Sequence, residues 1–346
     1  MVKSRQTITP VQPQPMTQRS VKILATGQYL PQRAVTAQEL AQKIGVSEAW
    51  IARKSGVMVR HFVEDETAAQ MGAAAAQAAL ATAQLTPQDL DCIVCASTVP
   101  EQGIPCTAAL VQRHLGLGAS GIPGFDINAT CLSFVVALDT ISYLIEAGRY
   151  HRVLIVSSEI ATLALDWSDP ESCTLFGDGA AAVIVEKTPP AESSAILASR
   201  LETYGDGADL SRCLGGGSKH HPREYATHPE HFVFQMDGRA VYRMAAKLLP
   251  DFVQRIFQPT GLAMGDMQLV IPHQASVMAM RLLSQQLGIP AEALMVIAHD
   301  HGNTIAASIP MALHEAIRQG RIRRGNRALL LGTAAGLSLG GIVLEY

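Results

Sequence analysis

The chain has 346 residues, of which 48% are hydrophobic and 16% are charged, and its net charge is −3. Charged residues usually make up about a quarter of a soluble protein, so much of this chain is expected to lie in a large core or at a subunit interface. This composition excludes disorder over most of the chain, and 27 Lys and Arg against 30 Asp and Glu exclude the basic footprint of a nucleic-acid binder.

The N-terminal segment 1–19 is predicted to be a disordered polar tail. Lys3 and Arg5 are followed by a Pro- and Gln-rich stretch rather than by the apolar region of a secretory signal. The most apolar run, 71–85, is mostly alanine and is shorter than the ~20 residues that a membrane span needs. Without an export signal or a membrane span, the six cysteines are expected to be reduced thiols in the cytoplasm.

Strand-like and helix-like segments alternate after the tail. A first strand is expected at 21–27, a short helix capped by Thr36 at 36–44, and an Ala-rich helix at 65–83. This alternation predicts an α/β protein with helices on both faces of its sheet. A buried strand run is expected at 92–97, a strand end at 125–128, and further strands at 153–157 and 180–185.

The second half of the sequence repeats the first. Segments 110–150 and 282–322 align without a gap at an offset of 172 residues, and the matches fall on turn glycines and buried aliphatic residues. We interpret the chain as a duplicated α/β unit with halves at 20–190 and 191–346. The Gly- and His-rich stretch 205–231 has no counterpart in the first half and is expected to be an inserted surface loop.

Cys131 is the candidate nucleophile. It is predicted to start the helix that continues through the apolar stretch 132–145, where the positive end of the helix dipole favours a thiolate. The alternative is a small core residue, which is how free cysteine usually behaves. Cys92 and Cys95 lie inside a strand, and their C-x-x-C pattern has no second pair that would complete a zinc site.

His273 and Asn303 complete a candidate catalytic set with Cys131. His273 follows a strand that ends at a proline, and Asn303 falls on Cys131 at the offset of 172. The three loops are therefore expected at comparable places beyond the carboxyl ends of the strands. A thiol, an imidazole and an amide suit covalent catalysis, although the order Cys, His, Asn also fits a papain-like protease. The residues after Cys131 and the duplicated α/β unit argue against a protease.

Glycines and histidines elsewhere in the chain offer weaker signals. Gly336 lies in a small-residue loop before the last strand, where a free backbone N–H would stabilise an oxyanion or where the sheet simply packs tightly. The nucleotide-binding interpretation of Gly177-Asp-Gly179 fails because the G-x-G-x-x-G spacing is missing. No acidic or Cys partner is recognised at ligand spacing around the histidines of the insert, so no metal is expected. These histidines are His220, His221, His228 and His231.

Several motifs together resemble the β-ketoacyl-acyl carrier protein synthase III family of the thiolase superfamily. The resemblance covers about residues 20–346 and implies a duplicated five-layer α-β-α-β-α sandwich, usually a homodimer. The motifs are Glu48-Ala-Trp-Ile, Phe125-Asp-Ile-Asn-Ala-Thr-Cys131, Phe176-Gly-Asp-Gly-Ala, Pro272-His-Gln-Ala, His301-Gly-Asn-Thr-Ile-Ala-Ala-Ser and the glycine loop around Gly336.

The resemblance implies an acyltransferase that forms carbon–carbon bonds by decarboxylative Claisen condensation. Cys131 would take an acyl group from coenzyme A or a carrier protein, while the N–H groups of Cys131 and Gly336 hold the oxyanion. His273 and Asn303 would then stabilise the enolate of a malonyl thioester. Coenzyme A or phosphopantetheine thioesters are substrates in this scheme, and no cofactor or metal is implied.

The thioester-handling residues depart from the family pattern. The resemblance places Trp50 and Ile104 near the substrate, with Ile104 at the dimer interface. Lys54 stands where the family has an arginine, and Arg239 and Ser276 stand where it has asparagines. These departures favour a specialised relative that acts on an unusual acyl chain or in secondary metabolism.

Two alternatives to this function stay open. A related enzyme would pass the acyl group to an oxygen or nitrogen nucleophile, or would condense without decarboxylation. A non-catalytic partner subunit is disfavoured because such subunits tend to lose the nucleophile, whereas this chain keeps Cys131, His273 and Asn303.

Overall fold

Two β-sheets form the frame of the protein in the computed structural model, which describes residues 18–346. The first sheet has the strand order β1-β7-β6-β4-β5 and the second has the order β11-β12-β13-β8. β4 runs parallel to β5 and β6, and β11 runs parallel to β12. The strands of the first sheet are β1 (Val21–Tyr29), β4 (Cys92–Cys95), β5 (Gly124–Asp126), β6 (Arg152–Glu159) and β7 (Gly179–Lys187). Those of the second are β8 (Ala195–Thr203), β11 (Leu269–Pro272), β12 (Arg327–Ala334) and β13 (Ser338–Glu345).

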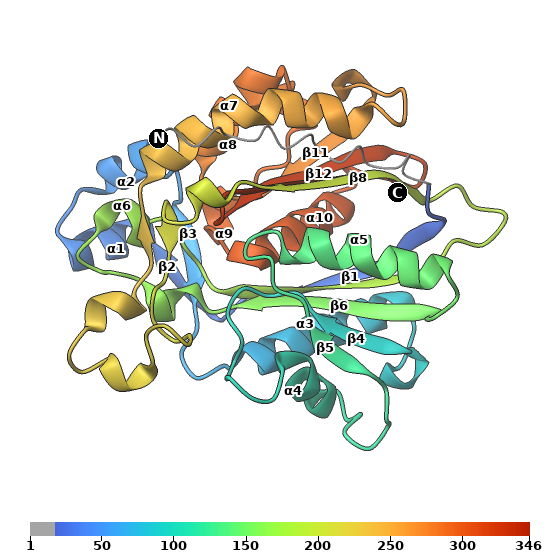
Figure 1. The fold of residues 1–346 in the computed structure, drawn as a ribbon, viewed down its shortest axis with the longest axis horizontal. Helices are drawn as coiled ribbons and strands as arrows, with labels where there is room; N and C mark the ends of the chain where they lie inside the picture. The colour runs from blue at the N-terminus through green and yellow to red at the C-terminus, as the bar shows by residue number, and fades with distance from the viewer. Residues whose placement is uncertain (1–17) are drawn as a thin grey trace, which may run out of the picture.

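Helices cover both faces of both sheets and produce five layers (Figure 1). The middle layer holds α5 (Ser133–Glu146) and α10 (Ser308–Arg318), whose apolar faces share one core between the sheets. The outer layers hold α3 (Ala68–Ala83) and α4 (Thr107–His114) on one side, and α7 (Gly238–Phe257) and α8 (Val277–Leu287) on the other. The expected α-β-α-β-α sandwich is confirmed.

Burial on both faces explains why the strands are continuously apolar. In β6, Val153 and Ile155 face the middle layer, whereas Leu154 and Val156 face α3 and α4. Successive side chains of a strand point to opposite faces, so a strand between two helix layers needs apolar residues at every position.

The two sheets have corresponding strand orders. β1, β7, β6 and β4 match β8, β13, β12 and β11 in succession, and a single bridge from Leu294 to Val270 stands in the place of β5. The division predicted near residue 190 falls between β7 and β8.

The structure contradicts the predicted tail at its C-terminal end. Arg19 is 1% exposed and pairs with Ile196 in a backbone bridge. Its guanidinium donates to Ser142, Tyr143 and Asp139, at 2.6 to 2.8 Å. The guanidinium of Arg19 has five N–H donors, and acceptors on α5 and β8 bind them, which allows this charged residue to be buried. The rest of the predicted tail, 1–17, lies outside the described residues.

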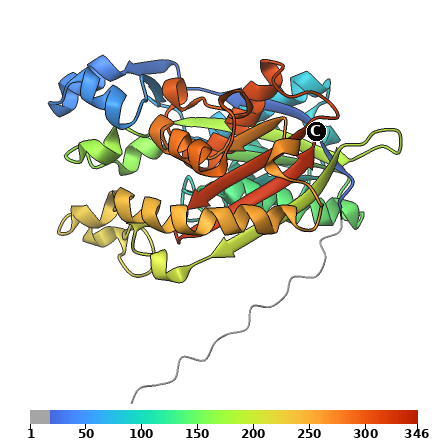
Figure 2. The same ribbon diagram turned by 90° about the horizontal axis from the view of Figure 1, so that it is seen from above.

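Smaller elements gather at one end of the layers, and the blue N-terminal segment and the gold insert both lie at this end in the two views (Figures 1 and 2). The insert is closed by a two-stranded pair, β9 with β10, so it is more structured than the surface loop expected from the sequence. The small elements are β2 (Arg33–Thr36), α1 (Ala37–Ile44), α2 (Glu48–Lys54), β3 (Val59–Phe62), α6 (Pro170–Cys173), β9 (Ser211–Arg212), β10 (Gln235–Met236) and α9 (Ala298–His301).

The predicted cap of the first helix is confirmed, because the Thr36 side chain accepts a hydrogen bond from the Glu39 amide. No helix within 18–346 has the length and apolar character that crossing a membrane requires.

Candidate active site

The candidate site is built from residues at or just beyond the carboxyl ends of four strands. Cys131 follows β5, Glu159 is the last residue of β6, His273 follows β11, and Ala335 follows β12. Parallel strands bring such ends to a common edge, which is where ligands bind in α/β sheets.

A tight turn presents Cys131. Thr130 has a φ of +52°, and α5 begins at Ser133 after Leu132 as its N-cap. Cys131 therefore lies one residue before the cap rather than at the first position of the helix. The Thr130 hydroxyl donates to the Ala129 carbonyl at 2.8 Å and reaches the Ala335 carbonyl at 3.4 Å, which holds the cysteine turn against the final glycine loop.

The free thiol of Cys131 is neutral at physiological pH. Burial raises the pKa of the Cys131 thiol to about 12, and the Glu159 carboxylate also raises it. The backbone amides of Cys131 and Ala335 hydrogen-bond the sulfur and oppose this shift. The prediction that the helix dipole favours a thiolate in the free protein is therefore wrong, because desolvation outweighs the dipole at this half-buried position.

The amide that reaches the sulfur from the final loop belongs to Ala335, whereas the sequence-based prediction named Gly336. Gly336 has a φ of +142°, a conformation that side chains other than glycine's rarely allow. Gly336 thus shapes the turn beside the Ala335 amide.

Leu132 fills a space that two glycines leave open. A Cβ on Gly332 would lie 3.0 Å from a Leu132 methyl, and one on Gly340 would lie 2.9 Å from the other. Leu132 is buried, so the bulky residue after the nucleophile is accommodated by β12 and β13 rather than by the substrate space.

His273 is buried and oriented by Ser308. Its Nδ1 lies 2.6 Å from the Ser308 hydroxyl, which also lies 3.4 Å from the Gln274 amide. The hydroxyl can accept from the amide and donate to Nδ1, which leaves Nε2 to carry the ring proton. Burial lowers the pKa of His273 to about 4, so the ring is neutral at pH 7 and can donate from Nε2.

Asn303 is fixed by the strand-like segment that precedes β7. Its amide donates to the Leu175 carbonyl at 2.8 Å, and its carbonyl accepts from the Gly177 amide at 3.2 Å. Its Oδ1 accepts from the Ile305 amide at 2.9 Å, so the side-chain NH₂ group remains as the donor for a ligand.

A chain of contacts connects the three candidate catalytic residues. Gly332 lies between Leu132 and the Cβ of His273. His273 contacts Ser308, which lies five residues after Asn303. The Ala306 amide, in the same segment, hydrogen-bonds the Glu159 carboxylate. The charge of Glu159 in turn raises the pKa of the Cys131 thiol. The structure thus brings together the segments of Cys131, His273 and Asn303.

Glu159 is a site residue that sequence reasoning missed. Its carboxylate accepts from the Thr98 amide at 2.5 Å and from the Val99 amide at 3.4 Å. Burial raises the pKa of Glu159 to about 8. The signal in the sequence was an acidic residue at the end of the buried strand run 153–158, beyond which ligands bind in this fold class.

Replacing Glu159 with glutamine is expected to speed alkylation of Cys131 by roughly threefold to tenfold at pH 9. The folded-state pKa of Glu159, about 8, lies above its usual value, so its charge and its effect on the thiol are present above pH 8 and fade below it. The measurement is the rate of iodoacetamide modification of the Cys131 peptide at pH 6 and pH 9. Exposed Glu292→Gln is the control, and equal rates for wild type and E159Q at pH 9 would contradict the prediction.

The structure gathers three predicted substrate-binding residues around Glu171, which the sequence analysis did not identify. Lys54 Nζ lies 2.9 Å from the Glu171 carboxylate and 5.7 Å from the Trp50 ring centre. The hydrogen bond from Lys54 lowers the pKa of Glu171, and the charge of Arg239 contributes in the same direction. Glu171 therefore offsets part of the positive charge of Lys54 and Arg239, which a coenzyme phosphate would meet.

Ser276 and Ile104 lie at two other edges of the site. Ser276 is buried and caps α8, where its hydroxyl accepts from the Ala279 amide at 3.0 Å. The next residue, Val277, donates to the carbonyl of Ser55, so Ser276 lies beside the Lys54 segment. Ile104 is 88% exposed. It lies on the loop whose Thr98 and Val99 amides donate hydrogen bonds to the Glu159 carboxylate.

Comparison with known proteins identifies the family. The model for 3-oxoacyl-[acyl-carrier-protein (ACP)] synthase III matches residues 125–205, and the model for the C-terminal part of that family matches residues 257–346. The chain is 36% identical to the β-ketoacyl-[acyl-carrier-protein] synthase III of Aquifex aeolicus, over 94% of this chain and 99% of the relative. It is 34% identical to that of Methylococcus capsulatus, over 95% of this chain and 99% of the relative.

Solved structures agree with this assignment. The crystal structure of 3-oxoacyl-[acyl-carrier-protein] synthase III from A. aeolicus superposes with a TM-score of 0.85 at 36% identity, covering 94% of this chain and all of the other. The priming β-ketosynthase of the R1128 polyketide pathway gives 0.85 at 30% identity, covering 97% and 98%. The chain therefore belongs to the 3-oxoacyl-[acyl-carrier-protein] synthase III family, whose members are acyltransferases with a thiolase fold.

Proposed function

We propose that the protein joins an acyl group to a malonyl unit by decarboxylative Claisen condensation. The observation that carries the proposal is the buried His273, whose Nδ1 lies 2.6 Å from the Ser308 hydroxyl, together with Asn303, whose Oδ1 is occupied by the Ile305 amide, so that each keeps a donor for a ligand. An oxyanion formed at the acylated cysteine would meet the amides of Cys131 and Ala335, and a second oxyanion would meet His273 and Asn303.

The first half-reaction attaches the acyl group. The sulfur of Cys131 attacks the carbonyl of an acyl thioester, and the amides of Cys131 and Ala335 stabilise the tetrahedral oxyanion. The bond to the departing thiol breaks, and the thiol proton of Cys131 leaves with that thiol. The raised pKa of the free cysteine fits an enzyme whose nucleophile is activated only when a thioester is bound.

The second half-reaction forms the carbon–carbon bond. A malonyl thioester loses carbon dioxide, and Nε2 of His273 and the NH₂ group of Asn303 stabilise the resulting enolate. The enolate carbon attacks the acyl carbonyl, and the Cys131 thiolate leaves. A neutral imidazole suits this role because it donates a hydrogen bond without needing a proton from solvent.

Acyl-coenzyme A or acyl carrier protein is the proposed acyl donor, and no further cofactor is invoked. The pairing of Lys54 with Glu171 and the nearby Arg239 support a carrier or an acyl chain unlike that of the usual primers. Similarity to a priming β-ketosynthase of a polyketide pathway is in keeping with a specialised role.

A homodimer in the cytoplasm is the proposed working form. Ile104, 88% exposed, and Leu163, 79% exposed, are apolar side chains that a second subunit would cover. All six cysteines are unpaired, as expected in a reducing compartment.

The test separates the two half-reactions. Intact-protein mass spectrometry after incubation with acyl thioesters of several chain lengths is expected to show one acyl group, which maps to Cys131 and is absent from Cys131→Ala. Adding a carboxyl-labelled malonyl thioester should then release labelled carbon dioxide. Failure of every acyl thioester to modify Cys131 would overturn the proposal. Acylation without carbon dioxide release would instead indicate transfer to another nucleophile or condensation without decarboxylation.

A further inference from the structure

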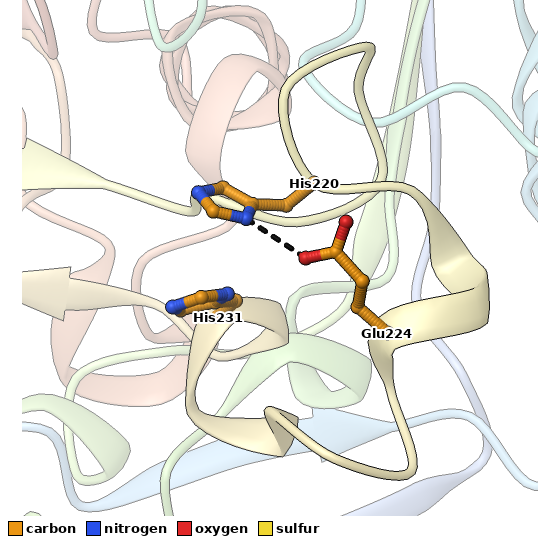
Figure 3. Close-up of side chains that lie close together, drawn as sticks. All are labelled: His220, Glu224 and His231. Atoms are coloured by element: carbon orange, nitrogen blue, oxygen red, sulfur yellow. Dashed lines mark hydrogen bonds and ion pairs between the residues drawn. The ribbon is translucent and has the colours of Figure 1, made fainter.

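The insert between β9 and β10 holds a compact group of potential metal ligands (Figure 3). His220 Nδ1 lies 3.0 Å from a carboxylate oxygen of Glu224, and one ligand atom from each of His220, Glu224 and His231 lies within 4.8 Å of the other two. The sequence analysis found no acidic residue at ligand spacing around these histidines. That prediction is wrong, because a helical turn of the insert returns Glu224 to His220.

Two features of this group suit a metal ion. Nδ1 of His231 is buried and has no hydrogen-bond partner among the described residues. The rings of His220 and His231 lie close together, with 4.1 Å between their centres. Two imidazoles and one carboxylate are a donor set that zinc accepts, and they leave one tetrahedral position for solvent.

The ligands are held by the backbone of the insert rather than by chance contacts at its surface. The Gly215 amide donates to the His231 carbonyl at 2.6 Å, and the Gly216 amide donates to the His220 carbonyl at 3.0 Å. A Cβ on Gly215 would overlap the ring of Phe232, so this ring packs directly on the backbone next to His231. One glycine turn thus fixes the relative position of both histidines.

A second trio in the insert shares His231 but is less suitable. It consists of His228, Glu230 and His231, and His228 and Glu230 are 54% and 58% exposed. By comparison, His220 and His231 are 20% and 21% exposed. Ligands that are already desolvated and ordered lose less entropy when they bind an ion.

We propose that His220, Glu224 and His231 bind one divalent transition-metal ion, of which zinc fits best, and that the ion fastens the insert. Zinc bonds of about 2.0–2.2 Å place tetrahedral ligand atoms roughly 3.3 Å apart, so small side-chain rotations close the site. The proposal does not depend on the reaction that Cys131 carries out.

The position of the insert gives the ion a structural role beside the active site. The amide of Phe234 donates to the Ala164 carbonyl at 2.7 Å, and its ring meets that of Phe176 at 5.3 Å between centroids. Phe176 pairs with Asn303 through a backbone bridge. A fastened insert therefore braces the segment that carries Asn303.

The experiment measures zinc binding by the full chain after removal of metal with a chelator. Competition with a zinc-sensitive dye at pH 7.5 is expected to give one site of micromolar affinity or tighter. His220→Gln and His231→Gln should each weaken it by about tenfold or more, because each removes a ligand. All proteins carry Cys213→Ser, since the exposed Cys213 thiol would also bind zinc.

Two controls make the outcome decisive. His114→Gln, at an exposed position on α4, and His228→Gln should bind zinc within twofold of the parent. Zinc should slow tryptic cleavage after Lys219 and Arg223 in the parent but not in H231Q, a readout that needs no catalytic activity. Absence of stoichiometric binding by the parent would overturn the proposal, as would unchanged affinity in H220Q and H231Q. Loss of binding in H228Q would assign the ion to the other trio.

Discussion

Alanine in place of His273 should lower carbon dioxide release from a malonyl thioester by about 100-fold to 1000-fold, the usual cost of removing one preorganised oxyanion donor. Acylation of Cys131 should stay within severalfold of wild type, because the amides of Cys131 and Ala335 serve that step. The measurement pairs labelled carbon dioxide release with intact-protein mass spectrometry of the acyl-enzyme. Equal losses in both half-reactions would contradict the assignment of His273 to the second.

The surroundings of His273 and Asn303 provide matched variants. Ser308→Ala keeps the imidazole but removes the hydroxyl at Nδ1, so a smaller loss of carbon dioxide release is expected. Asn303→Asp keeps the oxygen that accepts from the Ile305 amide while removing the NH₂ donor, so its loss should resemble that of H273A. The imidazole pKa of about 4 means that His273 stays neutral between pH 7 and pH 6, and its protonation should not slow the reaction over that range.

The features that the sequence predicted well depend on local pattern. Strands buried on both faces are continuous apolar runs, and two site residues mark the ends of such runs, as Glu159 ends 152–159 and His273 follows 269–272. These patterns alone predict that the segments of Cys131, His273 and Asn303 converge. The repeat at an offset of 172 added the expectation that Cys131 and Asn303 occupy comparable loops.

The features that the sequence did not predict depend on the surroundings of each group in three dimensions. The pKa of Cys131 is set by desolvation and by Glu159, neither of which can be read from the helix that follows. The burial of Arg19 could not be predicted, because the partners that accept its hydrogen bonds lie on α5 and β8, more than a hundred residues away in sequence.

The charged residues around the site were also hidden in the sequence. Glu171 comes next to Lys54 only when α6 folds against α2, and Glu224 comes next to His220 only through the turn at 222–224. The residue types in the sequence show which chemical groups the protein has. Only the tertiary contacts decide which charged groups lie next to one another.

Alanine in place of Gly177 is expected to damage both stability and condensation. Its Cβ would lie 2.3 Å from the backbone carbonyl oxygen of His301 and 3.1 Å from the Cβ of Arg60. Neither neighbour can yield easily, since one is backbone and Arg60 is fully buried with hydrogen bonds to the carbonyls of Val57 and Thr174. Overpacking of this kind costs about 3 kcal/mol, which corresponds to a Tm lower by roughly 4 °C for a chain of this length.

The same substitution separates the role of the Asn303 segment from that of Cys131. Relief of the overlap has to move His301 away from Gly177 and, with it, Asn303, whose carbonyl accepts from the Gly177 amide. Carbon dioxide release by folded G177A should therefore fall by about tenfold or more, while acylation of Cys131 falls less. Gly118→Ala is the matched control, because its Cβ would meet no atom within 4 Å. Wild-type Tm and wild-type carbon dioxide release in G177A would show that the loop of Asn303 is not held by this contact.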